Sequence, residues 1–133
     1  MRRVVVLMGL LLIGLVQAQG TVYKLRVSEW SCAVNASGMM VAKGTVVNQS
    51  GQTLNNVRIN LRVADKQVTT VNGVPNRRVY GTNSAPIAVR SLANGARSRF
   101  EVQVKPSQSR NVQCQIWFRS PDIVQIPTRV PGQ

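Results

Sequence analysis

The stretch GTVVNQSGQTLNNVRINLRVAD, from Gly44 to Asp65, decides the fold because it contains a strand, a turn and a second strand. Asn, Ser and Gly in its NQSG segment are residues that turns favour. In the NNVRINLRV segment that follows, apolar and polar side chains alternate, which is typical of a β-strand with one face on a core. The apolar positions are Val57, Ile59, Leu61 and Val63, and the polar positions are Asn56, Arg58, Asn60 and Arg62.

The same alternation recurs in RSRFEVQVK (97–105) and VQCQIWFRS (112–120). VYKLRVSEW (22–30) and MMVAKGTVV (39–47) supply two earlier strands, and Gly44 inside the second indicates a bulge or close packing. These patterns predict an all-β fold, an immunoglobulin-like antiparallel β-sandwich of about seven strands.

Two regions depart from the pattern. Between Lys66 and Arg90 we expect a ragged edge strand near Gln67 to Val71, a long loop, and a short strand near Ile87 to Arg90. DIVQIPTRV (122–130) predicts a last strand that Pro127 confines to an edge or ends early. The final residues are expected to be extended and mobile.

The amino terminus resembles a secretory signal peptide. Arg2 and Arg3 precede an apolar run, and Val16-Gln17-Ala18 fits the small-x-small rule for cleavage. We expect residues 1–18 to form this signal helix, residues 19–122 the sandwich, and residues 123–133 the edge strand and tail. The protein would then be secreted or periplasmic and not an integral membrane protein. A retained membrane anchor is the alternative, although the apolar run is short of the ~20 residues that span a bilayer.

The charge indicates which kind of partner the protein favours, and the cysteine content indicates the compartment. The formal net charge is +13, with only four acids among 133 residues. Such a balance favours anionic partners, or else it only aids solubility. The two cysteines, Cys32 and Cys114, predict one disulfide in an exported chain, with two free thiols as the alternative. Both fall at the same end of the expected sandwich. Cys32 is out of step with Leu25 and Val27, so the chain must bend near Trp30 or Ser31.

Parts of this pattern resemble the FxLYD domain family and, more loosely, the bacterial CARDB domains. The features shared with these families are Gly44 to Asn48, Ser50-Gly51, Asp65, Leu92 to Gly95, and Phe100. The resemblance covers about Met39 to Phe118. In the motif that names the FxLYD family only Asp65 is kept. The resemblance implies an immunoglobulin-like sandwich in an exported or envelope protein, and it implies no catalytic residue.

The chain lacks the side chains that most enzymes use. It has no His, which removes the usual general base and the commonest metal ligand. Glu29 beside Trp30 is interpreted as a strand-end residue and not as a catalytic carboxylate. Asn35 and Asn48 begin glycosylation sequons, but both fall on expected turns. We therefore expect no catalytic site, no metal, no cofactor and no small-molecule substrate.

Three functions remain. The first is a non-catalytic binding or scaffolding module of the cell envelope that acts through a protein partner. The alternative is binding of an anionic polymer, either extracellular DNA or an acidic glycan, and the third is an enzyme or an enzyme-linked accessory domain. In an immunoglobulin-like sandwich the third and sixth strands are neighbours, so their outward residues would form a candidate binding face. These residues are Arg58, Arg62, Gln115, Trp117 and Arg119, with Asn56 and Asn60 beside them. A competing expectation is that the 66–90 loop or the carboxy-terminal tail covers Trp117.

Overall fold

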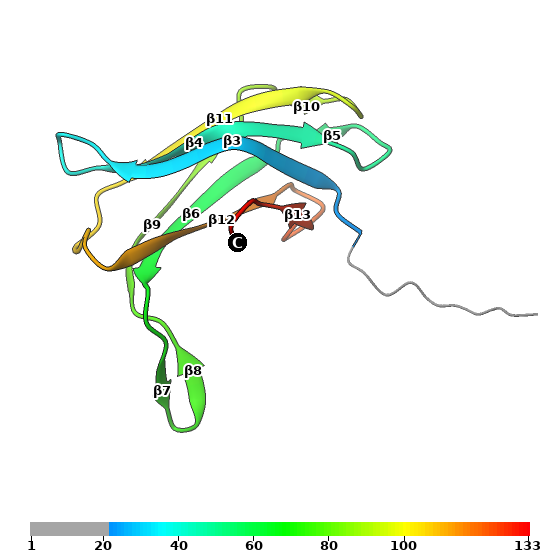
Figure 1. The fold of residues 1–133 in the computed structure, drawn as a ribbon. Helices are drawn as coiled ribbons and strands as arrows, with labels where there is room; N and C mark the ends of the chain where they lie inside the picture. Colours follow the sequence, from blue (N-terminus) through cyan, green and yellow to red (C-terminus); the bar gives the residue numbers. More distant parts are fainter. Residues whose placement is uncertain (1–21) are drawn as a thin grey trace, which may run out of the picture.

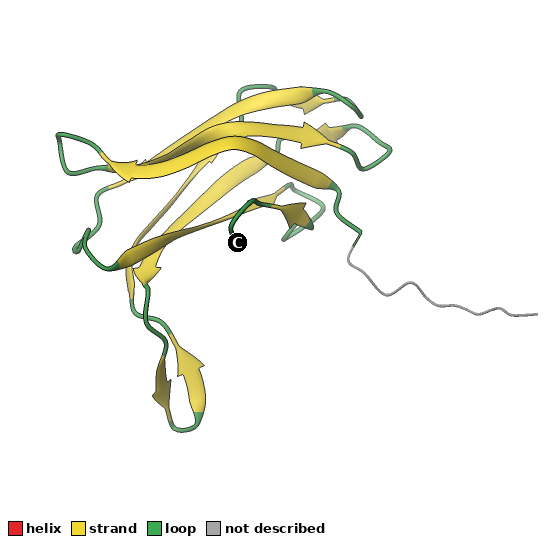
Figure 2. Ribbon diagram, viewed as in Figure 1, coloured by secondary structure: helices red, strands yellow, loops and turns green. Residues whose placement is uncertain are grey.

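The computed structural model describes residues 22–133, and this part of the chain contains strands, turns and loops but no helix (Figure 2). The all-β prediction is therefore confirmed. The predicted signal peptide, residues 1–18, lies outside the described residues. Within the described part, no helix is long and apolar enough to cross a membrane.

Two sheets face each other across one core (Figure 1). The larger sheet has the order β11-β4-β3-β13 and the smaller has the order β12-β6-β9. The strands of the larger sheet are β3 (Leu25–Val34), β4 (Met40–Asn48), β11 (Arg97–Val104) and β13 (Thr128–Arg129). Those of the smaller sheet are β6 (Arg58–Asp65), β9 (Val79–Pro86) and β12 (Val112–Arg119). The strands of these two sheets follow one another along the chain as β3, β4, β6, β9, β11, β12 and β13. In this order the pair β4–β11 joins the second strand to the fifth, and the pair β6–β12 joins the third to the sixth, which is the immunoglobulin-like arrangement.

Four short strands form two further ribbons. β5 (Leu54–Asn55) pairs with β10 (Ser91–Leu92), and β7 (Thr69–Val71) pairs with β8 (Val74–Asn76). The β7–β8 hairpin projects away from the sandwich (Figure 1). Its turn is Asn72-Gly73, and both residues have positive φ, as a type I′ hairpin turn requires.

The alternating residues of the sequence meet between the sheets. Val57, Ile59, Leu61 and Val63 are all at most 1% exposed. Phe100 of β11 and Phe118 of β12 meet edge to face, with ring centroids 5.3 Å apart. Because strands from both sheets contribute to this contact, burial of the alternating apolar face holds the two layers together.

The prediction for residues 66–90 was wrong in part. The expected edge strand is β7 of the projecting hairpin, and the expected loop contains β9, which pairs with β6 along almost its whole length. The short strand expected at Ile87 to Arg90 does not form. The sequence VYGTNSAP of β9 lacks alternation because this strand lies at the edge of the smaller sheet and has only partly buried or exposed side chains.

The carboxy-terminal prediction also needs correction. Only Thr128 and Arg129 form a strand, which runs parallel to β3 at the edge of the larger sheet, and Ile126 makes a single bridge to Phe118. The tail packs against the sandwich, since Val130 is buried and the Trp30 indole Nε1 donates to the Pro131 carbonyl at 3.1 Å. Pro127 separates the two pairings, because the chain moves there from β12 to β3.

The bend expected in β3 is a bulge opposite Gly44. Ser28 pairs with Thr45 and Ser31 with Lys43, so Glu29 and Trp30 together oppose Gly44. Glu29 has a φ of 52°, in the left-handed region. The extra residue changes which side chains face the core, so Leu25 and Val27 point inward before the bulge and Cys32 points inward after it. The disulfide predicted between Cys32 and Cys114 is present, with Cα atoms 6.4 Å apart.

Removing this disulfide should destabilise the fold. It closes a loop with a sequence separation of 82 residues, for which the chain-entropy model gives up to about 4.5 kcal/mol. We expect the double variant Cys32→Ala/Cys114→Ala to lose about 3–4 kcal/mol of unfolding free energy in urea titrations. Wild type titrated with reductant is the control for the loss of side-chain packing. Identical unfolding midpoints with and without reductant would show that the cysteines are not bonded.

Replacing Gly44 should also destabilise the protein. A Cβ there would lie 2.8 Å from Trp30 Cβ and 2.9 Å from Phe100 Cζ, which is closer than non-bonded carbon atoms approach one another. Gly→Ala within a strand ordinarily stabilises by roughly 0.5–1 kcal/mol, so the sign of the effect tests the contact. We expect Gly44→Ala to lower the unfolding free energy by about 1–3 kcal/mol, whereas the neighbouring Lys43→Ala should change it by less than about 0.5 kcal/mol. A stabilised Gly44→Ala would refute the close approach.

Candidate functional site

The structure brings the five candidate residues together on the outer face of the smaller sheet. Gln115 lies directly opposite Arg62, Trp117 opposite Asn60, and Arg119 opposite Arg58. We call the surface formed by these residues the arginine face. Its existence follows from the pairing of β6 with β12, which the sequence pattern predicted.

Arg62 organises the centre of the arginine face. Its Nε donates to Gln115 Oε1 at 2.8 Å, and its Cζ lies 5.7 Å from the centroid of the Trp117 ring. A guanidinium at this distance is attracted by the π electrons of the indole. Arg62 thus lies over the indole ring, which leaves less of the ring face for stacking with a base or a sugar.

A second basic position lies at the end of the face. Arg58 is partly buried, and its Nη2 donates to Ser84 Oγ of β9 at 3.2 Å. A hollow of about 180 Å³ next to it is lined by Asn56, Arg58, Arg119, Ser120 and Pro121, with no carboxylate among them. Two directly opposed arginines repel each other, so a bound anion would stabilise this position.

The sequence analysis did not predict that β9 adds a third row of residues to the arginine face. Ser84 and Thr82 of β9 lie directly opposite Asn60 and Arg62, and they extend the surface beyond the predicted residues. Asn60, in the middle row, keeps a buried Nδ2 that has no hydrogen-bond partner. Only the identification of β9 as a strand could have revealed these residues, and its irregular sequence hides it.

We expected that either the 66–90 loop or the carboxy-terminal tail would cover Trp117, and only the tail lies near it. The 66–90 region does not lie over the sheet, because β9 joins the sheet as a strand and β7–β8 projects away from it (Figure 1). The carboxy-terminal tail does lie beside Trp117, which lines a hollow together with Gln125, Gly132 and Gln133. Trp117 is consequently half-buried and not covered.

The opposite sheet carries a different surface. Arg97 and Arg99 belong to β11 and stay apart from the arginine face. On that side a cavity of about 380 Å³ is lined by Lys43, Arg99, Glu29 and Glu101 among others, so acids and bases are mixed there. The sequence did not indicate that two of the four acids share a cavity. No group of three potential metal ligands occurs among the residues that the structure describes.

Several motif residues have structural roles. Asn48 is fully buried, and its Nδ2 donates to the carbonyls of Gln52 and Leu92 at 2.7 and 2.8 Å. Asn35 Oδ1 accepts from the backbone N–H groups of Ser37 and Met39. Both sequon asparagines therefore build turns, and a buried Asn48 side chain is closed to glycosylation.

The comparisons with known proteins give little. No protein-family model matches this chain, and no curated protein matches it, so the resemblance to the FxLYD and CARDB domains stays a prediction. The similar solved structures include the crystal structure of DesR, a beta-glucosidase from Streptomyces venezuelae in complex with D-glucose. The sequence identity is 14% and the TM-score is 0.37, over 77% of this chain and 15% of that chain. A likeness at this level does not bear on the function.

The contact between Arg62 and Trp117 should be measurable as a coupling energy. Urea unfolding of Arg62→Ala, Trp117→Ala and the double variant gives the coupling, which we expect to be about 0.5–1 kcal/mol. The pair Arg119 and Trp117 serves as control and should couple by less than about 0.3 kcal/mol. Equal couplings for the two pairs would contradict a specific contact of Arg62 with the indole.

Proposed function

We propose that this protein is a non-catalytic binding or scaffolding module that acts outside the cytoplasm, in the cell envelope, through a protein partner that contacts the arginine face. The observation that carries the proposal is the ordered group of Arg62, Gln115 and Trp117 on two paired strands. A side chain held by a hydrogen bond and by an aromatic ring loses little rotamer freedom on binding. Trp and Arg are also the residue types that dominate binding energy at protein interfaces.

Four observations support the setting and the lack of catalysis. The Cys32–Cys114 disulfide fits an oxidising compartment, and the sequence of residues 1–18 has the pattern of an export signal. The chain contains no His, and the arginine face has no carboxylate or thiol among its five residues. Arginine, Trp and Gln side chains bind and orient other molecules, but they supply no nucleophile or general base.

A second candidate is binding of an anionic polymer. The hollow between Arg58 and Arg119 favours it, because the two opposed guanidiniums have no acid lining the space between them. Arg62 over the Trp117 ring makes base stacking less available, so an acidic glycan fits this surface better than single-stranded nucleic acid. Such binding would weaken steeply with salt, whereas a protein contact centred on Trp117 would weaken less.

The test compares two charge reversals of equal size. Arg58→Glu/Arg62→Glu alters the arginine face, and Arg97→Glu/Arg99→Glu alters β11 on the opposite sheet. Retention on a heparin column and capture of one protein, identified by mass spectrometry, from an envelope extract of the native host are measured from low to high NaCl. We expect capture to survive high salt and to be lost in the first variant and in Trp117→Ala, but kept in the second.

Other results would change the assignment. Heparin retention lost only in the first variant, without capture of any protein, would favour the polymer. If both charge reversals behave alike, net charge and not the arginine face governs binding, and the proposal is wrong. Unfolding curves of every variant confirm that the sandwich stays folded.

A further inference from the structure

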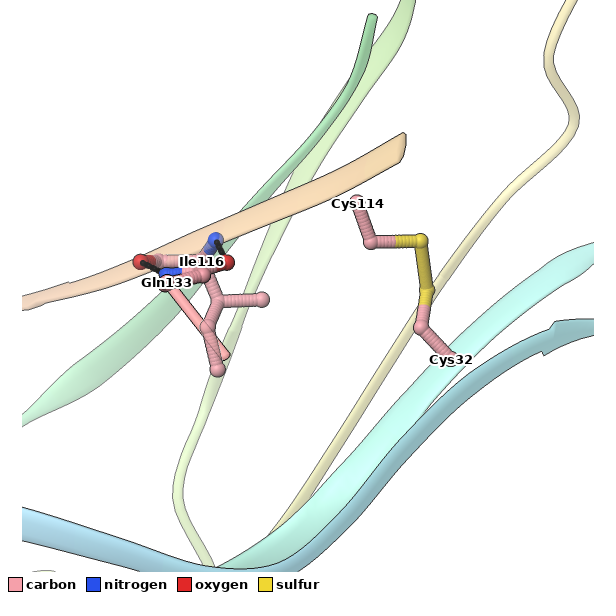
Figure 3. The surroundings of a disulfide bond; sticks show 4 residues. All are labelled: Cys32, Cys114, Ile116 and Gln133. Carbon is pink, nitrogen blue, oxygen red and sulfur yellow. Dashed lines mark hydrogen bonds between the residues drawn. A yellow bond between two sulfur atoms is a disulfide. The ribbon is translucent and has the colours of Figure 1, made fainter. Parts of the chain in front are cut away.

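One side of the sandwich is open. β12 is an edge strand of the smaller sheet, at the side opposite β9, and β3 is paired beyond β4 only at Leu25 and Arg26, where β13 joins it. The carboxy-terminal segment reaches β12 at two points, through the Ile126 bridge to Phe118 and through the side chain of Gln133 at Ile116. Beyond these points no strand closes the space between β3 and β12, and the disulfide crosses it (Figure 3).

The register shows which backbone groups of β12 are free. Ile116 directs its N–H and C=O away from β6, since both bond to the Gln133 side chain. Backbone groups alternate in direction along a strand, so those of Cys114 and Val112 point the same way. The bond from Lys66 N–H to Asn111 C=O confirms that odd positions face β6. Within residues 22–133 the outward groups of Val112 and Cys114 have no hydrogen-bond partner.

The facing edge of β3 is free in the same way. Asn35 N–H donates to Met39 C=O, so odd positions after the bulge face β4 and even positions face outward. The backbone groups of Cys32 and Val34 therefore point into the open side, and among the described residues they too lack partners. Four N–H and four C=O groups are thus left to solvent along the two edges, and such a row of unpaired groups can pair with another strand.

The space between these edges is a groove with both apolar and polar side chains in its lining. Two hollows of about 550 and 420 Å³ adjoin one another, because Trp30, Gln113 and Cys114 line both. Val34 is 47% exposed there, and Val112 and the disulfide are only partly covered. At its Val112 end the groove combines the apolar side chains of Val34, Val112 and the disulfide with unpaired backbone groups, and an added β-strand satisfies both.

Gln133 already imitates such a strand at one position. Its Oε1 accepts from Ile116 N–H at 3.1 Å, and its Nε2 donates to Ile116 C=O at 3.3 Å (Figure 3). A primary amide that bonds to both groups of one residue reproduces the pairing of a neighbouring strand. The next outward positions along β12, Cys114 and Val112, offer the same pair of groups without an occupant.

We propose that the free edge of β12 at Val112 and Cys114 binds an extended segment of the partner protein, which adds a strand to the smaller sheet. The edge of β3 is less suited, because the bulge at Glu29 and Trp30 interrupts it and the Trp30 indole is engaged with Pro131. This inference rests on the proposed function, in that the partner is a protein, and it names the chemistry of the contact.

Charge defines the segment further. Of the residues that line the two hollows, Arg62 alone is charged, and Arg110 and Lys66 flank the Val112 end of the strand. Asp65 lies opposite Val112, but its carboxylate accepts hydrogen bonds from Tyr80 Oη and Gln67 N–H. The bound segment is therefore acidic, with apolar residues at alternate positions. A second copy of this chain is a poor occupant, since each copy carries a large positive charge.

Hydrogen exchange measured by NMR tests the proposal on the folded wild-type protein. In the free protein the amides of Val112 and Cys114 should exchange quickly, while those of Gln113 and Gln115, bonded to β6, should exchange slowly. The probe is the synthetic peptide acetyl-Glu-Val-Thr-Val-Glu-Val-Asp-amide at millimolar concentration. We expect it to slow exchange at Val112 and Cys114 by about tenfold or more and to leave the edge of β11 unchanged.

Two control peptides isolate the contributions. The same peptide with every Val N-methylated keeps its side chains but loses the donors that pair with β12, and it should not slow exchange. A peptide with Lys at the three acidic positions should bind at least about tenfold more weakly. In the protein, Val112→Glu should abolish the effect by repelling the acidic peptide, with Val112→Ala as its control for lost packing.

The outcomes separate this inference from the proposed function. Arg58→Glu/Arg119→Glu changes the arginine face but not the lining of the groove, so peptide binding should persist there even if partner capture is lost. Slow exchange at Val112 and Cys114 in the free protein would overturn the inference, as would unchanged exchange with saturating peptide. Concentration-dependent dimers in analytical ultracentrifugation that protect Cys114 would show a second copy as the occupant and overturn it equally.

Discussion

The structure depends on the bulge in β3, where one extra residue is accommodated because β4 has a glycine, Gly44, at the opposite position. Glu29 and Trp30 together oppose Gly44, and only a glycine lets the Trp30 backbone come so close. The bulge turns Cys32 toward the core, where it meets Cys114 of the other sheet. Without it, Cys32 would face solvent, and the two sheets would be joined by side-chain packing alone on the side where no strand closes them.

The prediction from sequence succeeded in strands where one face is buried, because apolar and polar residues then alternate along the sequence. The alternation in 57–63 and in 112–118 predicted the pairing of β6 with β12, the core and the relative positions of Arg62, Gln115 and Trp117. It also exposed the misfit of Cys32, from which the bend followed. β9 escaped detection, because a strand with partly buried and exposed side chains has no apolar alternation to reveal it.

The open groove could not be predicted for a different reason. Whether β12 is an edge depends on where the last segment of the chain goes, and a parallel pairing of two residues with β3 leaves no local signal. Pro127 indicates an interruption but not its direction. The unpaired groups of Val112 and Cys114 become visible only when the register of each strand is known.

The arginine face and the groove are continuous surfaces. Arg62 and Trp117 belong to the face and also line one hollow of the groove, next to Gln133. A partner that adds a strand to β12 would bring its adjoining residues over the Arg62 guanidinium. The two surfaces can therefore act as one interface, in which backbone pairing supplies alignment and the arginines select an acidic sequence.

The β7–β8 hairpin has a consequence for how this domain can be modified. Every residue of its two strands is exposed, and at its base Arg77 Nη1 donates to the carbonyls of Asp65 and Lys66. Since the sandwich core takes no side chain from the hairpin tip, the segment from Val71 to Val74 is a natural insertion point for foreign peptides. An epitope or a fluorophore-attachment sequence placed there would be displayed on the projecting hairpin, away from the core (Figure 1).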